Sequence, residues 1–297
     1  MKLRIGTRRS RLALAQANEV ADALRSVGLQ AELVPMETSG DRGADPSIDP
    51  AGLKGLFVAE IVGALRDGEV DLAVHSAKDL PAIEEADLAI AAVPERASPL
   101  DVVVTRDGEL RPGQVVGTSS LRRQAQVSRW RPDVLLKDLR GNVDTRLRKL
   151  EGGEVDALIL AAAGLVRLGI VPEHAAPMSV AEMVPAPGQG CLAVQARADD
   201  EPTLEALAAF DHAPSRTALE AERGLMARLG GGCALPLGAF AEPSHDGVRM
   251  TAIVLSPDGE RFARSNVEAA TPAEAAELAA LDLFADGADE ILSAVRP

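Results

Sequence analysis

One of the two cysteines lies in a glycine-rich segment that is typical of a reactive or modified thiol. Cys233 follows Gly230, Gly231 and Gly232 and precedes Ala234, so few side chains flank its sulfur. A structural cysteine usually packs within an apolar run, whereas successive glycines let a bulky group approach the backbone. The same glycines are also typical of the cap at the end of a helix. A modified cysteine and a plain helix cap therefore both remain open at this point.

A second segment gathers four kinds of chemical group within five residues. His75, Ser76, Lys78 and Asp79 come directly after an apolar run of strand length. Loops at the ends of strands often carry catalytic groups. A carboxylate beside cations tends to stay ionised, so Asp79 is suited to stabilise a developing positive charge or to accept a hydrogen bond from an N–H group. The alternative interpretation is a Lys–Asp turn on the surface.

Arginine-bearing turns follow four of the expected strands, at residues 7–11, 117–124, 139–146 and 163–167. In doubly wound sheets the carboxyl ends of the strands face the ligand crevice. The segment Gly117–Ser120 adds hydroxyls, backbone N–H groups and the positive end of a helix. Arginine offers paired donors that suit carboxylates and phosphates. Any one turn is explained equally well as a helix cap with solvated charges, but four together predict a site for a small anionic ligand.

Composition and charge exclude several classes of protein. The 297 residues carry a net charge of −14, with one tryptophan, no tyrosine and five phenylalanines, which argues against a nucleic-acid surface with stacking aromatics. No apolar run approaches the roughly 18 residues of a membrane span, and no signal peptide precedes the first expected strand. Two cysteines 42 positions apart give no disulfide framework. We therefore expect a cytoplasmic protein with no nucleic-acid or membrane partner, in which Cys191 is structural.

Other catalytic motifs are missing from the sequence. It has no Gly-x-Ser-x-Gly motif of a serine hydrolase, and its four histidines are scattered without metal-ligand spacing. Neither a Walker phosphate loop nor a Gly-x-Gly-x-x-Gly fingerprint is present. Residues 96–185 are more basic than the segments on either side, which favours a local anion site in an acidic protein.

Strand-like and helix-like patterns alternate along most of the chain, which predicts α/β domains with largely parallel sheets. The expected strands are Lys2–Thr7, Ala31–Met36, Val70–His75, Ala89–Val93, Val102–Thr105, Val115–Gly117, Val134–Leu136, Ala157–Ala161 and Cys191–Arg197. Helices are expected after Ser10 and over Phe57–Arg66, Leu121–Trp130, Val143–Glu151 and Ala162–Leu168. The long segment Thr38–Gly55 is rich in glycine, proline and aspartate and predicts a mobile loop or a lid.

The pattern breaks near residues 94–99 and 183–188, which predicts two domain boundaries. From about Pro214 it changes to a helix, three strands (Leu237–Glu242, Val248–Leu255 and Phe262–Val267) and the helix Ala273–Phe284. We expect the strand at 191–197 to return to the first domain, so that two crossings form a hinged cleft. The predicted domains are residues 1–95 with 190–208 (α/β), 96–189 (α/β) and 213–297 (α+β, with Cys233).

Taken together, these segments closely resemble the hydroxymethylbilane synthase, or porphobilinogen deaminase, family. The match covers nearly the whole chain, although the third domain matches more loosely and the loop 40–52 differs in detail. The matching segments are Ile5–Arg8, Lys54–Val58, Ala73–Asp79, Gly117–Gln124, Leu139–Leu147, Ala163–Gly169, Gly188–Gly190 and Gly231–Cys233.

The resemblance implies a transferase of porphyrin biosynthesis with two doubly wound, periplasmic-binding-protein-like domains and a small α+β domain. Such an enzyme joins four porphobilinogen molecules head to tail, releases ammonia at each step, and hydrolyses the chain to give a linear tetrapyrrole. The resemblance also implies a dipyrromethane cofactor, attached covalently to Cys233, on which the polypyrrole intermediates grow. It further suggests a monomer.

The resemblance assigns roles to residues by position. Asp79 matches the catalytic aspartate, which contacts pyrrole N–H groups and stabilises the cation formed when ammonia leaves. Besides Cys233, the residues implied to bind the cofactor are Ser76, Lys78, Thr118, Ser120, Arg122, Arg123, Arg140 and Gly141. Those implied to bind substrate are Arg8, Ser10, Phe57, Arg146, Arg167 and Gln189. Because each porphobilinogen carries an acetate and a propionate, a row of arginines suits the growing polyanion.

Two other classes of protein fit part of the pattern. A hinged ligand-binding module would also have two α/β lobes with anion-binding loops, and it would bind reversibly without releasing ammonia. A transferase that uses a cysteine nucleophile would leave the Cys233 thiol free to be alkylated. The state of this sulfur in the isolated protein separates the three hypotheses.

Overall fold

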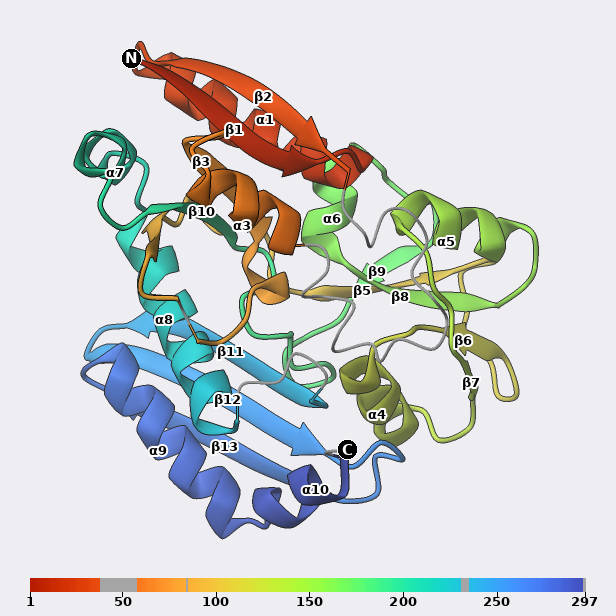
Figure 1. Ribbon diagram of the computed structural model, residues 1–297. Coiled ribbons are helices and arrows are strands. Elements are labelled where there is room, and N and C mark those ends of the chain that lie inside the picture. The colour runs from red at the N-terminus through yellow and green to blue at the C-terminus, as the bar shows by residue number, and fades with distance from the viewer. Residues whose placement is uncertain (38–57, 84, 231–234, 296–297) are drawn as a thin grey trace.

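Three β-sheets organise the chain (Figure 1). The computed structural model describes residues 1–37, 58–83, 85–230 and 235–295. Two sheets have five strands each, in the orders β2-β1-β3-β10-β4 and β7-β6-β8-β5-β9, and the third has the order β11-β12-β13. The predicted class of fold, two α/β units and a small α+β unit, is confirmed.

The first lobe is the sheet that contains the N-terminal strand, together with its helices. Its strands are β1 (Lys2–Arg8), β2 (Gln30–Met36), β3 (Leu72–Ser76), β4 (Leu88–Ala92) and β10 (Leu192–Arg197). Its helices are α1 (Arg11–Ser26), α3 (Ala59–Arg66) and α7 (Glu201–Ala208), and the 3-10 turn η1 (Ala77–Asp79) follows β3.

Both faces of this sheet are buried. In β3, Leu72 and Val74 belong to a core cluster with Leu24 of α1, whereas Ala73 belongs to the opposite cluster with Ile61 of α3. Because successive side chains of a strand point to opposite faces, helices on both sides give a continuous apolar strand. The alternation fixes β3 in the middle of the sheet, with its carboxyl end free to carry polar groups.

The second lobe repeats this plan in the middle of the chain. Its strands are β5 (Asp101–Thr105), β6 (Val115–Gly117), β7 (Leu135–Lys137), β8 (Ala157–Ala161) and β9 (Ala175–Pro177), and its helices are α4 (Leu121–Trp130), α5 (Val143–Glu151) and α6 (Ala162–Arg167). Position for position, the order β7-β6-β8-β5-β9 corresponds to β2-β1-β3-β10-β4 of the first lobe.

The expectation of largely parallel sheets is wrong for half of the strand pairs. β1 lies parallel to β2 and β3, and β6 lies parallel to β7 and β8. β10 and β5 run antiparallel to both of their neighbours. Each of these two strands enters its sheet after the chain has crossed from the other lobe, so no helical crossover within the sheet requires a parallel direction.

The two crossings between the lobes lie against each other. The amide of Ala97 in the first crossing donates a hydrogen bond of 3.3 Å to the carbonyl of Gly190 in the second. Gly190 has a φ of +88°, and a Cβ at this position would lie 2.4 Å from the carbonyl oxygen of Ala97. Only glycine allows this approach, which explains the last residue of the Gly-Gln-Gly segment.

The third unit is a three-stranded antiparallel sheet with helices on one face. It consists of α8 (Ala213–Arg228), β11 (Leu237–Ser244), β12 (Gly247–Leu255), β13 (Phe262–Ala269), α9 (Pro272–Ala285) and α10 (Ala288–Val295). Met250 and Val254 of β12 pack in the helical core, whereas Ile253 and Leu255 cluster with Ala125 of α4. The open face of this sheet therefore rests on the second lobe. The sequence patterns did not predict β9, α7 or α10.

Candidate active site

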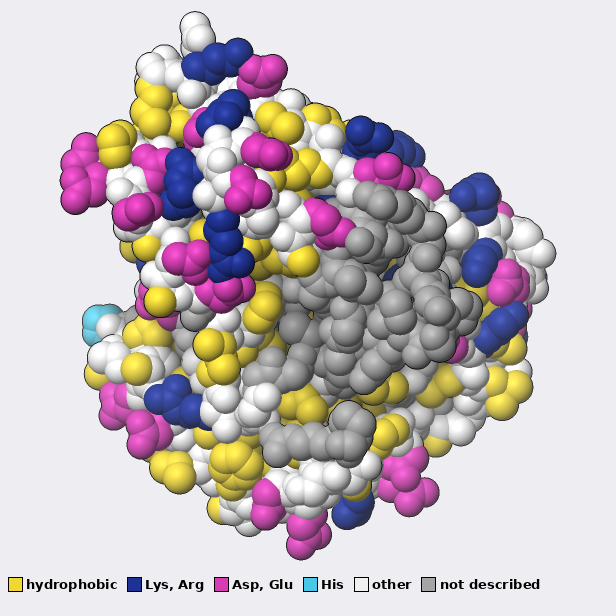
Figure 2. All heavy atoms as spheres, in the orientation of Figure 1, with side chains coloured by type: hydrophobic (Ala, Val, Ile, Leu, Met, Phe, Trp, Pro, Cys, Tyr) yellow, Lys and Arg dark blue, Asp and Glu magenta, His cyan; other side chains and the backbone are white. Residues whose placement is uncertain are grey.

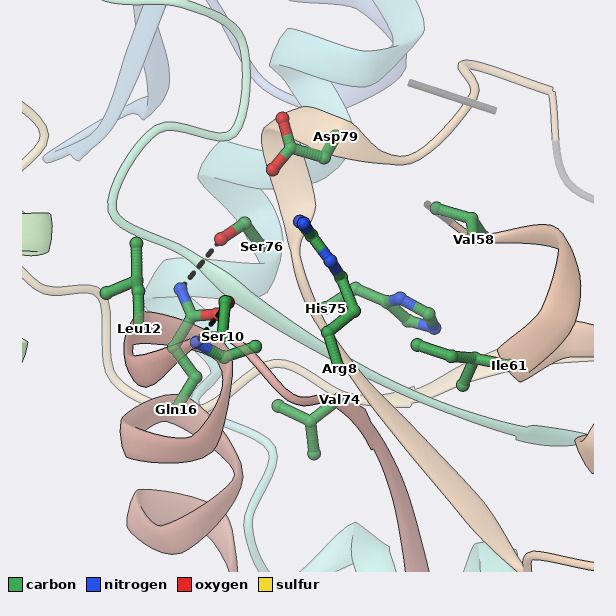
Figure 3. A pocket seen from close by; sticks show the side chains of 11 residues that line it. Arg8, Ser10, Leu12, Gln16, Val58, Ile61, Val74, His75, Ser76 and Asp79 are labelled. Carbon is green, nitrogen blue, oxygen red and sulfur yellow. Dashed lines mark hydrogen bonds between the residues drawn. The ribbon is translucent and has the colours of Figure 1, made fainter. Parts of the chain in front are cut away.

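A pocket opens where β1 and β3 of the first lobe end (Figure 3). The turns after these two strands are far apart in the sequence, yet their polar groups meet here, as the rule for carboxyl ends of parallel strands predicts. In Figure 3 the side chain of Arg8 extends toward Asp79. The pocket is lined by the polar residues Arg8, Ser10, Gln16, His75, Ser76 and Asp79, and by Leu12, Ala13, Val58, Ile61 and Val74.

Local hydrogen bonds fix the hydroxyl groups of this pocket. Ser10 is the N-cap of α1, and its Oγ accepts a hydrogen bond of 3.3 Å from the amide of Ala13. The side-chain amide of Gln16, one turn further along α1, donates to Oγ of Ser76 at 2.7 Å. The two strand-end turns are thereby tied to the same helix, which holds the mouth of the pocket in one shape.

His75 forms part of the wall and carries no charge at neutral pH. Its side chain is buried, and this burial lowers its pKa to about 4, against the opposing effect of Asp79. Among the described residues, its Nε2 atom has no hydrogen-bond partner. A neutral imidazole at this position leaves Asp79, at the end of η1 and only partly buried, as the negative group of the pocket.

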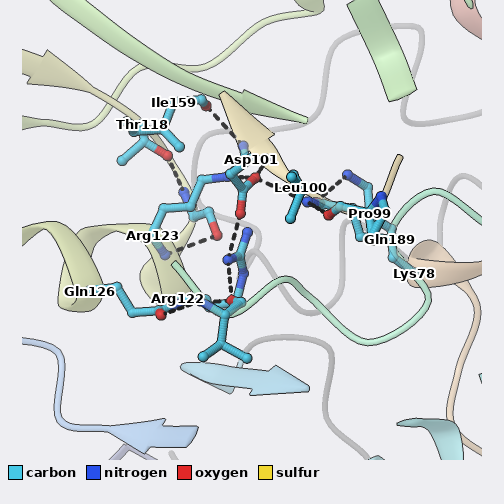
Figure 4. Close-up of polar contacts among 12 residues, drawn as sticks. Lys78, Pro99, Leu100, Asp101, Thr118, Arg122, Arg123, Gln126, Ile159 and Gln189 are labelled. Carbon is cyan, nitrogen blue, oxygen red and sulfur yellow. Dashed lines mark hydrogen bonds and ion pairs between the residues drawn. The ribbon is translucent and has the colours of Figure 1, made fainter. Parts of the chain in front are cut away.

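In the second lobe, two of the predicted arginines surround one carboxylate (Figure 4). Oδ1 of Asp101 accepts hydrogen bonds from Nε and Nη2 of Arg123, at 3.0 and 2.6 Å. Nη1 of Arg122 lies 2.8 Å from Oδ2 of Asp101. All three residues are buried, and despite the cost of burial the two guanidinium groups lower the pKa of Asp101 to about 2. The cluster has one negative and two positive charges, and this excess of positive charge favours an anion nearby.

Gln189 joins this cluster to the first lobe. Its Nε2 donates to Oδ1 of Asp101 at 3.1 Å and to the carbonyl of Pro99 at 2.7 Å, and its Oε1 accepts from Nζ of Lys78 at 3.3 Å. Lys78 lies beside Asp79 in η1. A chain of polar contacts thus runs from the first lobe, through the second crossing, to the first turn of α4.

The Thr118–Ser120 turn is built as a helix cap. Ser120 is the N-cap of α4, and its Oγ accepts from the amide of Arg123 at 3.5 Å. Oγ1 of buried Thr118 accepts from the amide of Ser120 at 3.3 Å. The helix-cap interpretation therefore applies to this turn, and its use as an anion seat stays a prediction that these contacts do not exclude.

Three predicted residues of the α5 region differ in exposure. Arg140 and Gly141 are exposed, and Nε of Arg140 donates to Oδ2 of Asp138 at 3.2 Å. Arg146 is partly buried. Loss of hydration, reinforced by the positive charge of Arg123, lowers its pKa to about 10. Its buried Nε has no hydrogen-bond partner among the described residues.

Arg167 ends α6 and reaches back to the first lobe. Its Nε lies 2.9 Å from Oε2 of Glu19 on α1, and its Nη2 donates to the carbonyl of Gly190 at 3.2 Å. The four arginine turns are therefore not equivalent. One lines the first-lobe pocket, one is paired internally with Asp101, one holds an arginine whose buried Nε has no partner in the described part of the chain, and one bridges the two lobes.

A buried ion pair fastens the third unit to both crossings. Nη1 of Arg96 lies 2.7 Å from Oε1 of Glu222 on α8. Oε2 of Glu222 accepts from the amide of Gly188 at 2.6 Å, and Nε of Arg96 donates to the carbonyl of Gln189 at 2.9 Å. The helix that precedes the Cys233 segment is thus anchored at the hinge. Phe57 and Cys233 themselves lie outside the described residues.

Sequence reasoning missed several residues that shape these sites. Asp101, Gln16 and Glu19 contact predicted groups from 22 to 148 positions away, and Glu222 pairs with Arg96, which was not predicted either. Asp101 begins a strand and Glu222 lies in α8 among several other charged residues, and a single carboxylate at such a position is a weak signal. A charged residue inside an otherwise buried pattern was the one cue available for Glu222.

Comparisons with known proteins agree over nearly the full chain. The family described as "Porphobilinogen deaminase, dipyromethane cofactor binding domain" matches residues 3–205, and "Porphobilinogen deaminase, C-terminal domain" matches residues 217–284. The porphobilinogen deaminase of Brevibacillus brevis is 45% identical over 301 residues, which cover 99% of this chain and 97% of the relative. That of Acidothermus cellulolyticus is 46% identical over 305 residues, which cover 99% and 92%.

Among solved structures, a periplasmic substrate-binding protein from Coxiella burnetii matches with a TM-score of 0.42 and 16% identity, over 72% of this chain and 93% of that one. Within the described ranges, no helix is both long and apolar enough to cross a membrane. Two family matches that span most of the chain, and relatives above 40% identity over almost all of it, leave one assignment. The chain belongs to the porphobilinogen deaminase family.

Proposed function

We propose that this chain is a hydroxymethylbilane synthase, which condenses four porphobilinogen molecules with release of ammonia and hydrolyses the product to a linear tetrapyrrole. The observation that carries the proposal is the single chain of polar contacts that joins the Asp79 turn, through Lys78 and Gln189, to the arginine cluster of the second lobe. A carboxylate that is linked to a cluster of arginines suits a substrate that is a polyanion and develops positive charge during reaction.

The second lobe fits a dipyrromethane cofactor. Nε of Arg146 and Nε of Arg122 are buried without a hydrogen-bond partner among the described residues. A buried guanidinium N–H without a partner is costly, and a carboxylate is a group that would satisfy it. The residues that would hold the acetate and propionate groups are Ser76, Lys78, Thr118, Ser120, Arg122, Arg123, Arg140 and Gly141, with the tether at Cys233.

Bound there, the cofactor would supply the nucleophilic pyrrole carbon to which the first unit is joined, and each later unit would be joined to the last pyrrole of the growing chain. Asp79 stabilises the positive charge that porphobilinogen develops while its C–N bond breaks and the electron pair leaves with ammonia. Arg8, Ser10 and Arg167 bind the carboxylates of the incoming substrate. Buried His75 stays neutral, so it excludes water from the pocket wall without adding a charge that would oppose the cation.

The remaining substrate contacts are proposed at Phe57, Arg146 and Gln189. We also propose that the domains follow the three sheets, as residues 1–95 with 190–208, 96–189 and 213–297, and that the protein is a cytoplasmic monomer. Figure 2 supports the absence of a nucleic-acid partner for the face it shows, where acidic and basic side chains are mixed over the lobes. The net charge of −14 points the same way.

Intact-mass spectrometry of two cysteine variants tests this function. We expect Cys233→Ser to lose both the covalent pyrrole adduct and turnover. Cys191→Ala is the matched control, since Cys191 is buried and burial raises the pKa of its thiol to about 12, which makes it unreactive. It should keep the adduct. Addition of porphobilinogen should then produce stepwise mass increments and free ammonia.

Several outcomes would contradict the proposal. A normal adduct on Cys233→Ser would place the tether elsewhere. A wild-type protein without an adduct that binds anions reversibly and releases no ammonia would indicate a binding module instead. A free Cys233 thiol that alkylates readily in the active wild-type enzyme would indicate a cysteine nucleophile.

A further inference from the structure

Two ion pairs connect α1 of the first lobe to the second lobe. Glu19 pairs with Arg167 of α6 at 2.9 Å, and Arg11 pairs with Asp144 of α5 at 2.6 Å. The partners lie 148 and 133 positions apart in the sequence, so both pairs depend on the way the lobes meet. Their exposure differs greatly, because the Arg167 side chain is 7% exposed and that of Arg11 is 67% exposed.

The guanidinium of Arg167 is held on two sides. Glu19 accepts from its Nε, and the carbonyl of Gly190 in the second crossing accepts from its Nη2 at 3.2 Å. A guanidinium has five N–H donors in a fixed plane, and these two contacts use two of them. The remaining donors, two on Nη1 and one on Nη2, keep the geometry needed to bind a carboxylate end-on. Glu19 therefore orients the guanidinium of Arg167 without using its remaining N–H donors.

We propose that Glu19 is a positioning residue that sets the affinity of Arg167 for a substrate carboxylate. This inference rests on the proposed function, in which Arg167 binds porphobilinogen. The carboxylate of Glu19 has two opposed effects. Its hydrogen bond fixes the plane of the guanidinium, and its negative charge offsets the positive charge that attracts the substrate. Glu19 thus keeps the affinity of Arg167 for the substrate carboxylate moderate.

The variant Glu19→Gln separates these two effects. The glutamine oxygen still accepts a hydrogen bond from Nε, but the competing charge is gone. We expect KM for porphobilinogen to fall about two- to fivefold, the range for a partly exposed ion pair, with kcat unchanged. Because the Glu19 side chain is 44% exposed, the midpoint of thermal unfolding should stay that of the wild type.

Asp144→Asn is the matched control, because it removes the other ion pair between α1 and the second lobe without touching Arg167. We expect its KM to equal that of the wild type. An equal fall of KM in both variants would show that looser lobes cause the effect, and would overturn the role of Glu19. An unchanged or raised KM in Glu19→Gln would overturn it too. Absence of ammonia release by the wild type would instead contradict the proposed function, and this inference with it.

Discussion

The two lobes share one strand order but hold their charges in opposite ways. In the first lobe, the strand-end groups Arg8 and Asp79 line a pocket. In the second lobe, at the start of α4, Arg122 and Arg123 turn inward and pair with buried Asp101. One topological position therefore supports an open site for chemistry in one lobe and an internal charge cluster in the other.

The difference lies in the residue that begins the antiparallel strand of each lobe, because this residue lies where a partner for the arginines could stand. Strand β5, which enters the second lobe from a crossing, lies beside the central strand β8 and begins with Asp101, which contacts the first turn of α4. β10 occupies the corresponding place in the first lobe and begins with Leu192. A carboxylate at this position draws the arginines into the core, and an apolar residue does not. The antiparallel crossing strand thus decides how each lobe holds its charges.

Removal of the Asp101 charge should have the largest effect. Asp101→Asn leaves two buried guanidinium groups without a counter-charge, and we expect the free energy of unfolding to fall by about 3–5 kcal/mol. Urea denaturation measures it. Asp133→Asn in the same lobe breaks an exposed pair with Arg131 and should cost less than about 1 kcal/mol. Equal losses in the two variants would mean that the second lobe has no internal charge cluster of the kind described.

Asp79 tests the open site of the first lobe. Asp79→Asn removes the charge that stabilises the developing cation, so we expect kcat to fall about 10²- to 10³-fold. The covalent adduct and the unfolding midpoint should persist, because Asp79 is only partly buried. Asp87→Asn, which removes an exposed carboxylate paired with Arg66, should leave ammonia release unchanged. Near-normal turnover of Asp79→Asn would remove its catalytic role.

The sequence predicted this contrast only in part. The meeting of Arg8 with Asp79 followed from the rule that parallel strands end at the same edge. The pairing of Arg123 with Asp101 did not, because apolar periodicity gives neither the direction of β5 nor its neighbours. Glu19 looked like any surface glutamate on a helix, since its partner lies 148 positions away. Local sequence patterns located the arginines, but contacts between distant segments determine which of them face a pocket and which are paired in the core.

Acid should weaken the first lobe before the second. The folded pKa of His75 is about 4, below its ordinary 6.5, so the unfolded chain binds a proton that the folded one does not between these values. The free energy of unfolding should therefore fall by about 3 kcal/mol from pH 6.5 to pH 4 through this residue. Asp101, with a folded pKa of about 2, loses its contribution only below about pH 4. Comparison of the pH dependence of wild type and His75→Gln measures the difference, and equal slopes would contradict it.

The smallest effect concerns Arg146, whose buried Nε has no hydrogen-bond partner among the residues that the structure describes. Burial lowers its pKa to about 10, so the fold disfavours its charge unless a ligand pairs with it. In the Cys233→Ser background, which we expect to lack the adduct, Arg146→Met should raise the free energy of unfolding by about 1–2 kcal/mol. With Cys233 intact, the same change should instead weaken substrate binding, because the guanidinium then has a carboxylate to bind. Arg148→Met, an exposed neighbour on α5, should do neither. Destabilisation by Arg146→Met in both backgrounds would show that the charge of Arg146 has a partner within the chain. Arg146 would then be paired internally, as Arg122 and Arg123 are, and would not be available to a ligand.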